Sequence, residues 1–128
     1  VKMKTKRLSN IEIEVMNVFW DTEEPLAATD IPKINPELNV NTVQATVRGL
    51  LKKSLIKVAD IVYHNTVLTR AYLPEISRDE YWANQLEIEA INKPSFLAAL
   101  IHQEEDLQLL EKLEELIKEQ KEKLLAAK

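Results

Sequence analysis

The sequence predicts a mainly α (α+β) fold, in which an N-terminal winged helix-turn-helix with a β-hairpin wing precedes an α-helical dimerisation region. Three observations support this class. Apolar residues recur at helical spacing in three segments before residue 54. Two runs rich in β-branched and aromatic residues follow, separated by a short polar turn. Helical spacing then returns up to the last residues, so we expect one domain over residues 1–75 and a second region over residues 76–128.

The composition is that of an ordinary globular protein, with 45% hydrophobic and 30% charged residues among 128. The absence of cysteine excludes disulfides, thiolate metal sites and cysteine nucleophiles, and the single glycine argues against a phosphate-binding glycine loop. No apolar run approaches the ~20 residues that a membrane span needs, and the basic start lacks the apolar core of a signal peptide. We therefore expect a cytoplasmic protein with no metal, no cofactor and no membrane contact.

Charge is distributed unevenly along the chain, whose net charge is −4. Residues 1–74 contain 10 Lys/Arg and 8 Asp/Glu, whereas residues 75–128 contain 7 and 13. A mildly basic first part and an acidic second part suggest two different roles on one chain.

The first helix is predicted to begin after Ser9 and to end near Asp21. Ser9 and Glu12 have the spacing of a capping box. Its buried stripe is formed by the apolar residues at helical spacing: Ile11, Val15, Val18 and Phe19. Trp20 is expected to pack against whatever covers this domain, with stacking on a ligand as the alternative.

A short second helix is predicted over residues 28–34. Thr29 is its expected cap, because this places Pro32 in the first turn, where the missing N–H costs nothing. Residues 35–38 then form the turn that leads to the next helix.

The third helix is predicted over residues 39–53, with Asn39 or Asn41 as its cap. One face carries the apolar residues of the core: Val43, Val47, Leu50 and Leu51. The opposite face carries small, amide-bearing and cationic side chains, and no carboxylate occurs in this range. Amides and guanidinium groups donate to base edges, and small residues let a helix approach closely, so this face suits a DNA groove. An ordinary surface helix is the alternative.

Residues 55–63 and 67–73 are predicted to be the strands of a hairpin, because they are rich in β-branched and aromatic residues. Residues 64–66 form the turn, with Asn65 as the candidate for a positive φ, and Pro74 ends the second strand. Three helices followed by a hairpin are the order of a winged helix, in which the third helix enters the major groove of DNA.

Three more helices are expected in the C-terminal region. The first follows a capping-box pattern at Ser77 and Glu80, the second covers residues 96–101 after Ser95 as cap, and the last covers residues 104–125. Their apolar stripes exceed what a region of about 50 residues can bury alone. We expect a second copy of the chain to cover them; folding of the last helix onto its own winged domain is the alternative. The candidate dimerisation residues are Tyr81, Trp82, Leu86, Phe96, Leu97, Leu100, Leu107, Leu110, Leu113 and Ile117.

Several ordered motifs carry a resemblance to a known family. The run Leu8-Ser9-x-x-Glu12-x-Glu14-Val15-Met16-x-Val18-x-Trp20 resembles the first helix of the penicillinase-repressor family, which includes methicillin-resistance and copper-transport repressors. Further motifs along the chain also resemble that family: Pro25-Leu26, Asn41-Thr42-Val43, Leu50-Leu51-Lys52-Lys53, Ala71-Tyr72-Leu73-Pro74-x-x-Ser77, Phe96-Leu97 and Glu104-Glu105-Asp106-Leu107. The last two resemble its C-terminal dimerisation region.

This resemblance implies a dimeric transcriptional repressor that binds a short inverted repeat in double-stranded DNA and blocks a promoter. By position, the residues that would face bases are Asn41, Thr42, Gln44, Ala45 and Arg48. Those that would contact the DNA backbone are Lys6, Arg7, Asn39, Lys52, Lys53 and Arg70.

The chain departs from the family at several positions. Ser54 replaces the usual glycine after the third helix, so the turn there must be made differently or with strain. Asn41 and Gln44 stand where the family tends to carry lysine or other polar residues, so the operator sequence does not carry over. The copper-binding cysteine cluster is absent, and Ala99-Leu100 occupies the position of the Asn-Phe bond that is cleaved in β-lactam-responsive members.

An enzyme is poorly supported, because His64 and His102 lack partners at the spacing of a metal site or a catalytic triad. The main alternative is a winged-helix protein-interaction module without DNA binding. That alternative predicts a neutral or acidic surface on the third helix, whereas this helix carries Arg48, Lys52 and Lys53.

Overall fold

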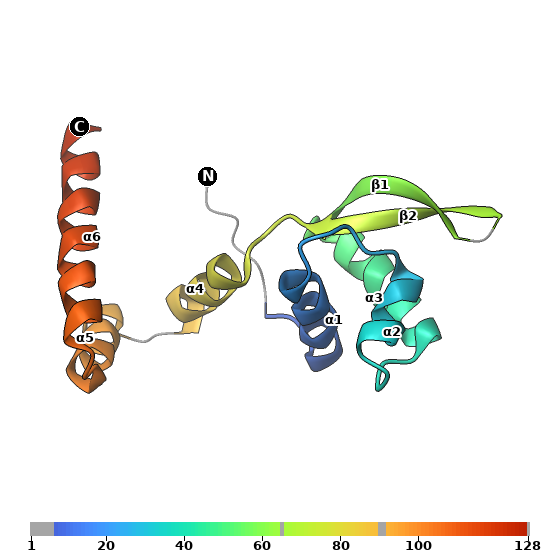
Figure 1. Cartoon of the computed structure of the whole chain (residues 1–128). Helices are drawn as coiled ribbons and strands as arrows, with labels where there is room; N and C mark the ends of the chain where they lie inside the picture. The colour runs from blue at the N-terminus through green and yellow to red at the C-terminus, as the bar shows by residue number, and fades with distance from the viewer. Residues whose placement is uncertain (1–6, 65, 90–91, 128) are drawn as a thin grey trace. The chain divides into compact units, whose positions relative to one another are not determined.

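The computed structural model describes residues 7–64, 66–89 and 92–127, which form two compact units divided between residues 88 and 89. The first unit contains the elements α1 (Asn10–Asp21), η1 (Ala28–Asp30), α2 (Ile31–Ile34), α3 (Val40–Lys52), β1 (Ile56–His64), β2 (Val67–Pro74) and α4 (Arg78–Glu89, whose last residue lies past the division). The second contains α5 (Lys93–Gln103) and α6 (Leu107–Ala126). Figure 1 shows this order along the ribbon.

The first unit is a winged helix, which confirms the predicted fold class. The strands β1 and β2 form an antiparallel hairpin in which Ile56 lies opposite Pro74 and His64 opposite Val67. The segment between α1 and η1 joins this sheet, because the N–H groups of Leu26 and Tyr72 each donate to the other's carbonyl oxygen, at 3.0 and 2.8 Å. This bridge fixes the start of the helix-turn-helix to the base of the wing. Asn65, the predicted positive-φ residue, lies outside the described residues.

The core of the first unit lies between α1, α3 and the base of the hairpin. Its fully buried members are drawn from segments that are distant in sequence: Val15, Met16, Phe19, Ile31, Val43, Leu50, Leu55, Ile56, Ile76 and Tyr81. The stripe expected on α1 differs at two positions, since Met16 is buried and Ile11 is half-buried. Burial of this apolar surface is the main force that holds α3 in place.

The predicted capping box of α1 is present. The N–H of Glu12 donates to Ser9 Oγ at 3.3 Å, and the N–H of Ser9 donates to Glu12 Oε1 at 3.0 Å. The two residues therefore satisfy each other's backbone donors at the start of the helix.

The second helix begins differently from the prediction. Residues 28–34 form a 3-10 turn followed by one α-helical turn, and Asp30 rather than Thr29 stands at the junction. Pro32 explains the break, because it has no N–H to donate to residue 28 and its ring crowds the preceding turn. The carboxylate of Asp30 accepts instead from the N–H of Ala27, at 2.9 Å.

α3 ends in a turn that normally requires glycine. The N–H of Leu55 donates to the carbonyl of Leu50, and the N–H of Ser54 donates to that of Leu51, both at 3.0 Å. This is the Schellman arrangement, in which the residue after the cap is left-handed. Ser54 takes that conformation with φ 63°, and no other non-glycine residue in the described ranges has a positive φ. The turn is therefore made in the usual way, with strain at Ser54.

The helix α4 packs into the winged unit, although the sequence analysis assigned it to the C-terminal region. Tyr81, expected at a dimer interface, is fully buried in the winged core. Arg78 Nη2 lies 2.7 Å from Asp21 Oδ1, and its guanidinium lies over the Trp20 ring, 5.5 Å from the centroid. Trp20 Nε1 donates to the carbonyl of Ile76 at 2.8 Å. The expected boundary at residues 75/76 misplaces this helix, because its contacts are made with segments far away in sequence.

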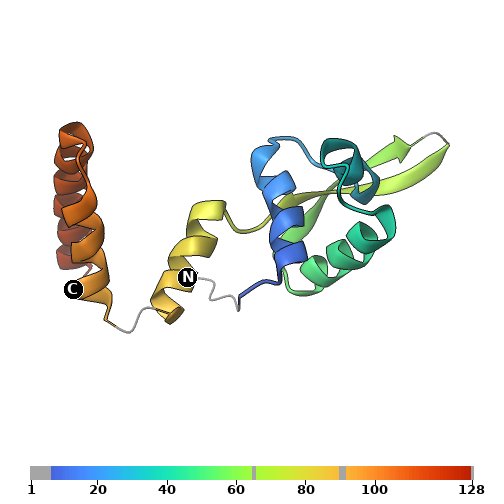
Figure 2. The same ribbon diagram turned by 90° about the horizontal axis from the view of Figure 1, so that it is seen from below.

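The second unit is a pair of helices, α5 and α6, joined by residues 104–106 (Figures 1 and 2). Asn92 caps α5 through its side chain, which accepts from the N–H of Ser95 at 3.1 Å, so the predicted cap at Ser95 is wrong. Asp106 caps α6, which begins at Leu107 and not at residue 104. No residue of either helix is buried within this unit. None of the described helices is both long and apolar enough to cross a membrane.

Candidate nucleic-acid interface

The outward face of α3 carries all five residues predicted to contact bases. Val43, Val47 and Leu50 point into the core, and this fixes which side of the helix remains open. The five exposed side chains are Asn41, Thr42, Gln44, Ala45 and Arg48. They combine amide, hydroxyl, methyl and guanidinium groups, which are the types that recognise base edges in the major groove.

The start of α3 is fixed by its cap. The side chain of Asn39 accepts from the N–H of Asn41 at 2.8 Å, as predicted for a helix N-cap. Asn39 is itself exposed, so its amide group can also reach outward. The first turn therefore presents Asn41 and Thr42 from a defined backbone position.

Two cations on α3 have no carboxylate partner among the residues that the structure describes. Within the described ranges, no ion pair involves Arg48 or Lys52, both of which are exposed. They lie four positions apart, which places them one turn apart on the same side of the helix. Uncompensated cations of this kind can neutralise phosphate groups or donate to a guanine edge.

The other predicted backbone contacts fall into separate groups. Arg7 is exposed before α1, and Lys6 lies outside the described residues. Arg70 is exposed on β2, opposite Ile61. Lys53 is different, because its Nζ lies 2.6 Å from Glu12 Oε2.

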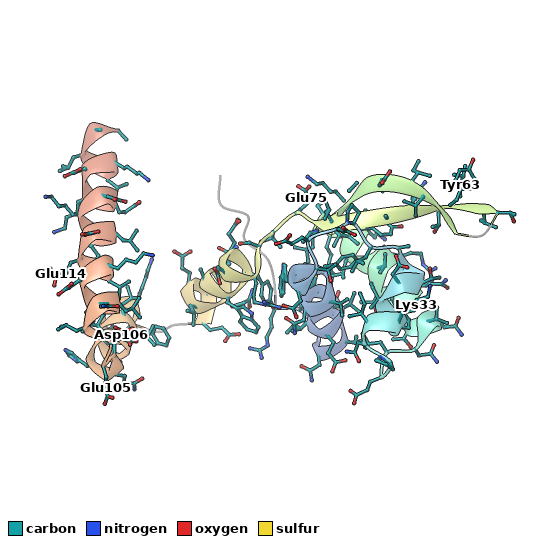
Figure 3. The ribbon with its side chains drawn as sticks, viewed as in Figure 1. Lys33, Tyr63, Glu75, Glu105, Asp106 and Glu114 are labelled. Carbon is teal, nitrogen blue, oxygen red and sulfur yellow. The ribbon has the colours of Figure 1, made fainter. Side chains whose placement is uncertain are left out.

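The hairpin has a more apolar outer face than the sequence analysis anticipated. Ile61 pairs with Arg70 and Tyr63 pairs with Leu68, which places all four side chains on one face of the antiparallel sheet. Ile61, Tyr63 and Leu68 are 60%, 74% and 59% exposed. Figure 3 shows Tyr63 near the tip of the wing. Side chains alternate between the two faces of a strand, so the spacing of Ile61, Tyr63, Leu68 and Arg70 is the sequence signal that could have revealed this face.

Lys33 was not among the predicted contacts, yet it is exposed in the last turn of α2 (Figure 3). Two apolar residues beside it are also open to solvent: Ile34 is 52% exposed and Val40, the first residue of α3, is 40% exposed. All three lie around the turn that joins α2 to α3. No local motif marks these residues as part of the candidate interface. Their position in the helix-turn-helix is the signal that could have found them.

The pKa of the Glu12 carboxyl group, in the first turn of α1, is lowered. Burial by itself would raise the pKa, but the hydrogen bonds from Lys53 and Ser9 and the positive charge of Lys53 outweigh it and lower the pKa below its ordinary value of 4.5. The carboxylate is therefore ionised whenever the protein is near neutral pH.

The predicted dimerisation residues lie in two places. Trp82 and Leu86 are exposed on α4, at 39% and 44%. Tyr81, on the same helix, is buried, and the other seven lie on the helical pair, where they are exposed or half-buried: Phe96, Leu97, Leu100, Leu107, Leu110, Leu113 and Ile117. Ile101, Leu110, Leu113 and Ile117, with Glu114, line a hollow of about 190 Å³ between α5 and α6.

Comparisons with known proteins agree with the resemblance seen in the sequence. The sequence model of the penicillinase repressor family matches residues 8–119. No protein with a curated description matches the chain.

Two of the solved structures that are similar to the chain are bacterial regulators. One is the adhesin competence repressor AdcR from Streptococcus pyogenes, with 12% identity, a TM-score of 0.42, and coverage of 92% of this chain and 81% of the other. The other is MarR of Staphylococcus aureus in complex with salicylate and kanamycin, with 13% identity, a TM-score of 0.41, and coverage of 92% and 73%. These values are low, so the winged-helix assignment rests on the chain's own elements.

Proposed function

Because the chain belongs to the penicillinase repressor family, we propose that it is a transcriptional repressor that binds an inverted-repeat DNA operator as a homodimer. The family consists of transcriptional regulators, not enzymes. The exposed face of α3, where amide, hydroxyl and cationic groups stand without a carboxylate, is the observation that carries the DNA-binding part of this proposal.

The proposed base contacts are the five exposed residues of α3: Asn41, Thr42, Gln44, Ala45 and Arg48. Arg7, Lys33, Asn39, Lys52 and Arg70 are proposed to contact the DNA backbone, because each is exposed around the helix-turn-helix, the segment before it or the wing. Lys6 remains a proposed contact from the sequence alone. Phosphate contacts would set the position of α3 in the groove, and its outward side chains would read the sequence.

The helical pair supports the dimer. Neither α5 nor α6 has a buried residue, although apolar side chains recur along both. Exposed apolar stripes of this kind require a covering partner. A second copy related by a two-fold axis would cover them symmetrically and would place two α3 helices on two half-sites.

The proposal is tested by selecting binding sites for the full chain from a library of randomised DNA duplexes. We expect an inverted repeat whose half-site centres lie about one helical turn apart, or a multiple of it. Affinity for the selected duplex should then be measured by fluorescence anisotropy over a series of salt concentrations. A repressor should lose affinity linearly on a log–log plot as salt rises, because phosphate contacts release counterions.

The alternative of a protein-interaction module is favoured by one observation, the exposed apolar face formed by Ile61, Tyr63 and Leu68 on the wing. The same experiment separates the two functions. Selection without an enriched motif, together with no binding of any duplex at low salt, would exclude the repressor and leave the interaction module.

A further inference from the structure

Lys53 lies at the end of α3 and is the one cation of that helix with an ion-pair partner among the described residues. It is the C-terminal cap of α3, and its N–H donates to the carbonyl of Gly49 at 3.0 Å. Its side chain reaches Glu12 Oε2, at 2.6 Å. The ion pair therefore links the C-terminal cap of α3 to the first turn of α1.

Glu12 is held on the other side by the capping box. Its Oε1 accepts from the N–H of Ser9 at 3.0 Å, so the two carboxylate oxygens have different partners. The Glu12 side chain is 15% exposed, whereas that of Lys53 is 51% exposed. The carboxylate is thus the fixed member of the pair, and it determines where the lysine ammonium group lies.

The charge of Lys53 is compensated within the protein. To contact a phosphate group, its ammonium group would have to leave Glu12, which would expose an uncompensated carboxylate beside the polyanionic backbone of DNA. Arg48 and Lys52 face no such cost, because neither has a carboxylate partner in the described part of the chain.

We propose that Lys53 is a positioning residue, which holds the C-terminal end of α3 against α1 through Glu12 and does not contact the DNA backbone. This inference rests on the proposed DNA-binding function and concerns how α3 is oriented for contact with DNA. The ion pair acts together with the strained turn at Ser54, which directly follows Lys53. Together they fix the end of the helix opposite to the one capped by Asn39.

The experiment uses the full chain, four single variants and one double variant. Lys53→Met removes the charge and keeps most of the side-chain length, and Lys53→Arg keeps a cation that can still pair with Glu12. Glu12→Gln keeps an oxygen acceptor for the N–H of Ser9 and removes the charge that holds Lys53. Lys52→Met is the matched control, since Lys52 is the adjacent exposed lysine without an ion pair. Each is tested on the selected duplex and on a duplex of scrambled sequence.

Salt dependence distinguishes positioning from phosphate contact. We expect Lys52→Met to reduce the slope of log affinity against log salt by about one, as the loss of one phosphate contact does. Lys53→Met should leave the slope unchanged. It should weaken binding to the selected duplex by about two- to fivefold, the scale of a partly exposed ion pair, with no loss on the scrambled duplex. Lys53→Arg should restore the affinity.

The sign of the Glu12→Gln effect gives a second criterion. Positioning predicts weaker binding to the selected duplex, and a Glu12→Gln/Lys53→Met double variant no weaker than either single variant. If Lys53 contacts phosphate, removing its carboxylate partner should instead strengthen binding. A stronger-binding Glu12→Gln protein, or a slope reduced by about one in Lys53→Met, would overturn the proposal.

Failure of the underlying function has a different signature. A wild-type chain that binds neither duplex at low salt overturns the repressor function, and this inference with it. Wild-type binding combined with a reduced slope in Lys53→Met overturns the inference alone. Circular dichroism of each variant shows whether it is folded, and a fully folded Lys53→Met protein that keeps wild-type affinity on both duplexes also contradicts the positioning role.

Discussion

The hydroxyl oxygen of Tyr81 accepts a 2.9 Å hydrogen bond from the backbone N–H of Leu8, which lies 73 positions earlier in the chain. Both residues are buried, with Leu8 4% exposed and Tyr81 0% exposed. The bond joins the segment before α1 to α4, and the Trp20 ring packs against Tyr81 at a centroid distance of 5.8 Å. α4 is thereby a structural part of the winged unit.

Replacing Tyr81 by Phe should lower the free energy of unfolding by about 1–3 kcal/mol, because it leaves the buried N–H of Leu8 without an acceptor. Urea denaturation followed by tryptophan fluorescence measures this loss. Tyr72→Phe is the control, since the described residues provide no hydrogen-bond partner for the Tyr72 hydroxyl. A Tyr81→Phe protein with unchanged stability but weakened self-association would restore the interface role predicted from sequence.

Replacing Ser54 by Gly should stabilise the protein. The left-handed conformation at φ 63° costs a non-glycine residue roughly 1–2 kcal/mol. Glycine also gives the unfolded chain more conformational entropy, which offsets about 0.4–1 kcal/mol of the relieved strain. We therefore expect the free energy of unfolding to rise by about 0.5–1 kcal/mol. Urea denaturation of Ser54→Gly and Ser54→Ala measures it. The alanine variant keeps the strain and should show no gain; equal stabilisation by both would contradict this account.

The stability of the protein should fall in acid partly through Glu12. Its folded pKa is below the ordinary value of 4.5, so its contribution is complete well above pH 4.5 and is lost as the pH falls through the folded pKa. The difference in unfolding free energy between the wild type and Glu12→Gln should therefore be constant near neutral pH and shrink in acid. Urea denaturation at a series of pH values measures this difference. A difference that stays constant into strong acid would show that the ion pair is not its source.

Replacing Arg48 by Ala should weaken binding to the selected duplex by about 1–3 kcal/mol if its guanidinium contacts a guanine edge. The loss should be smaller on a duplex in which the contacted base pair is changed. Anisotropy titrations with both duplexes measure the difference. Equal losses on selected and scrambled DNA would assign Arg48 to phosphate instead.

Replacing Ile117 by Asp should convert the proposed dimer to a monomer. Ile117 is 49% exposed and lines the hollow between α5 and α6, so a charge there would be buried without a partner in the dimer. Sedimentation equilibrium gives the mass of each species. Gln120→Asp, at an exposed polar position of the same helix, should leave the wild-type mass unchanged. A wild-type chain that is monomeric at every concentration would contradict the homodimer.

Local patterns of the sequence predicted the elements of the winged unit well. The capping box of Ser9 and Glu12, the apolar and polar faces of α3, and the two strands of the hairpin are each marked by a residue pattern within one short segment. Helical and strand periodicity determine which side chains share a face, and capping residues determine where a helix begins. The resemblance to the penicillinase repressor family relied on the same motifs, and its family model covers residues 8–119.

The surroundings of Tyr81 and Lys53 were decided by the tertiary structure. Each has a partner that its own neighbours in sequence do not specify. The sequence pattern places Tyr81 on the apolar face of an amphipathic helix. In the structure it accepts a hydrogen bond from Leu8 and packs against Trp20 in the core of the winged unit. In the sequence Lys53 is one more cation at the end of α3. In the structure it forms an ion pair with Glu12, 41 positions away. The periodicity of apolar residues predicts which face of a helix or strand a side chain lies on. Only the packing of distant segments determines which residues contact that face.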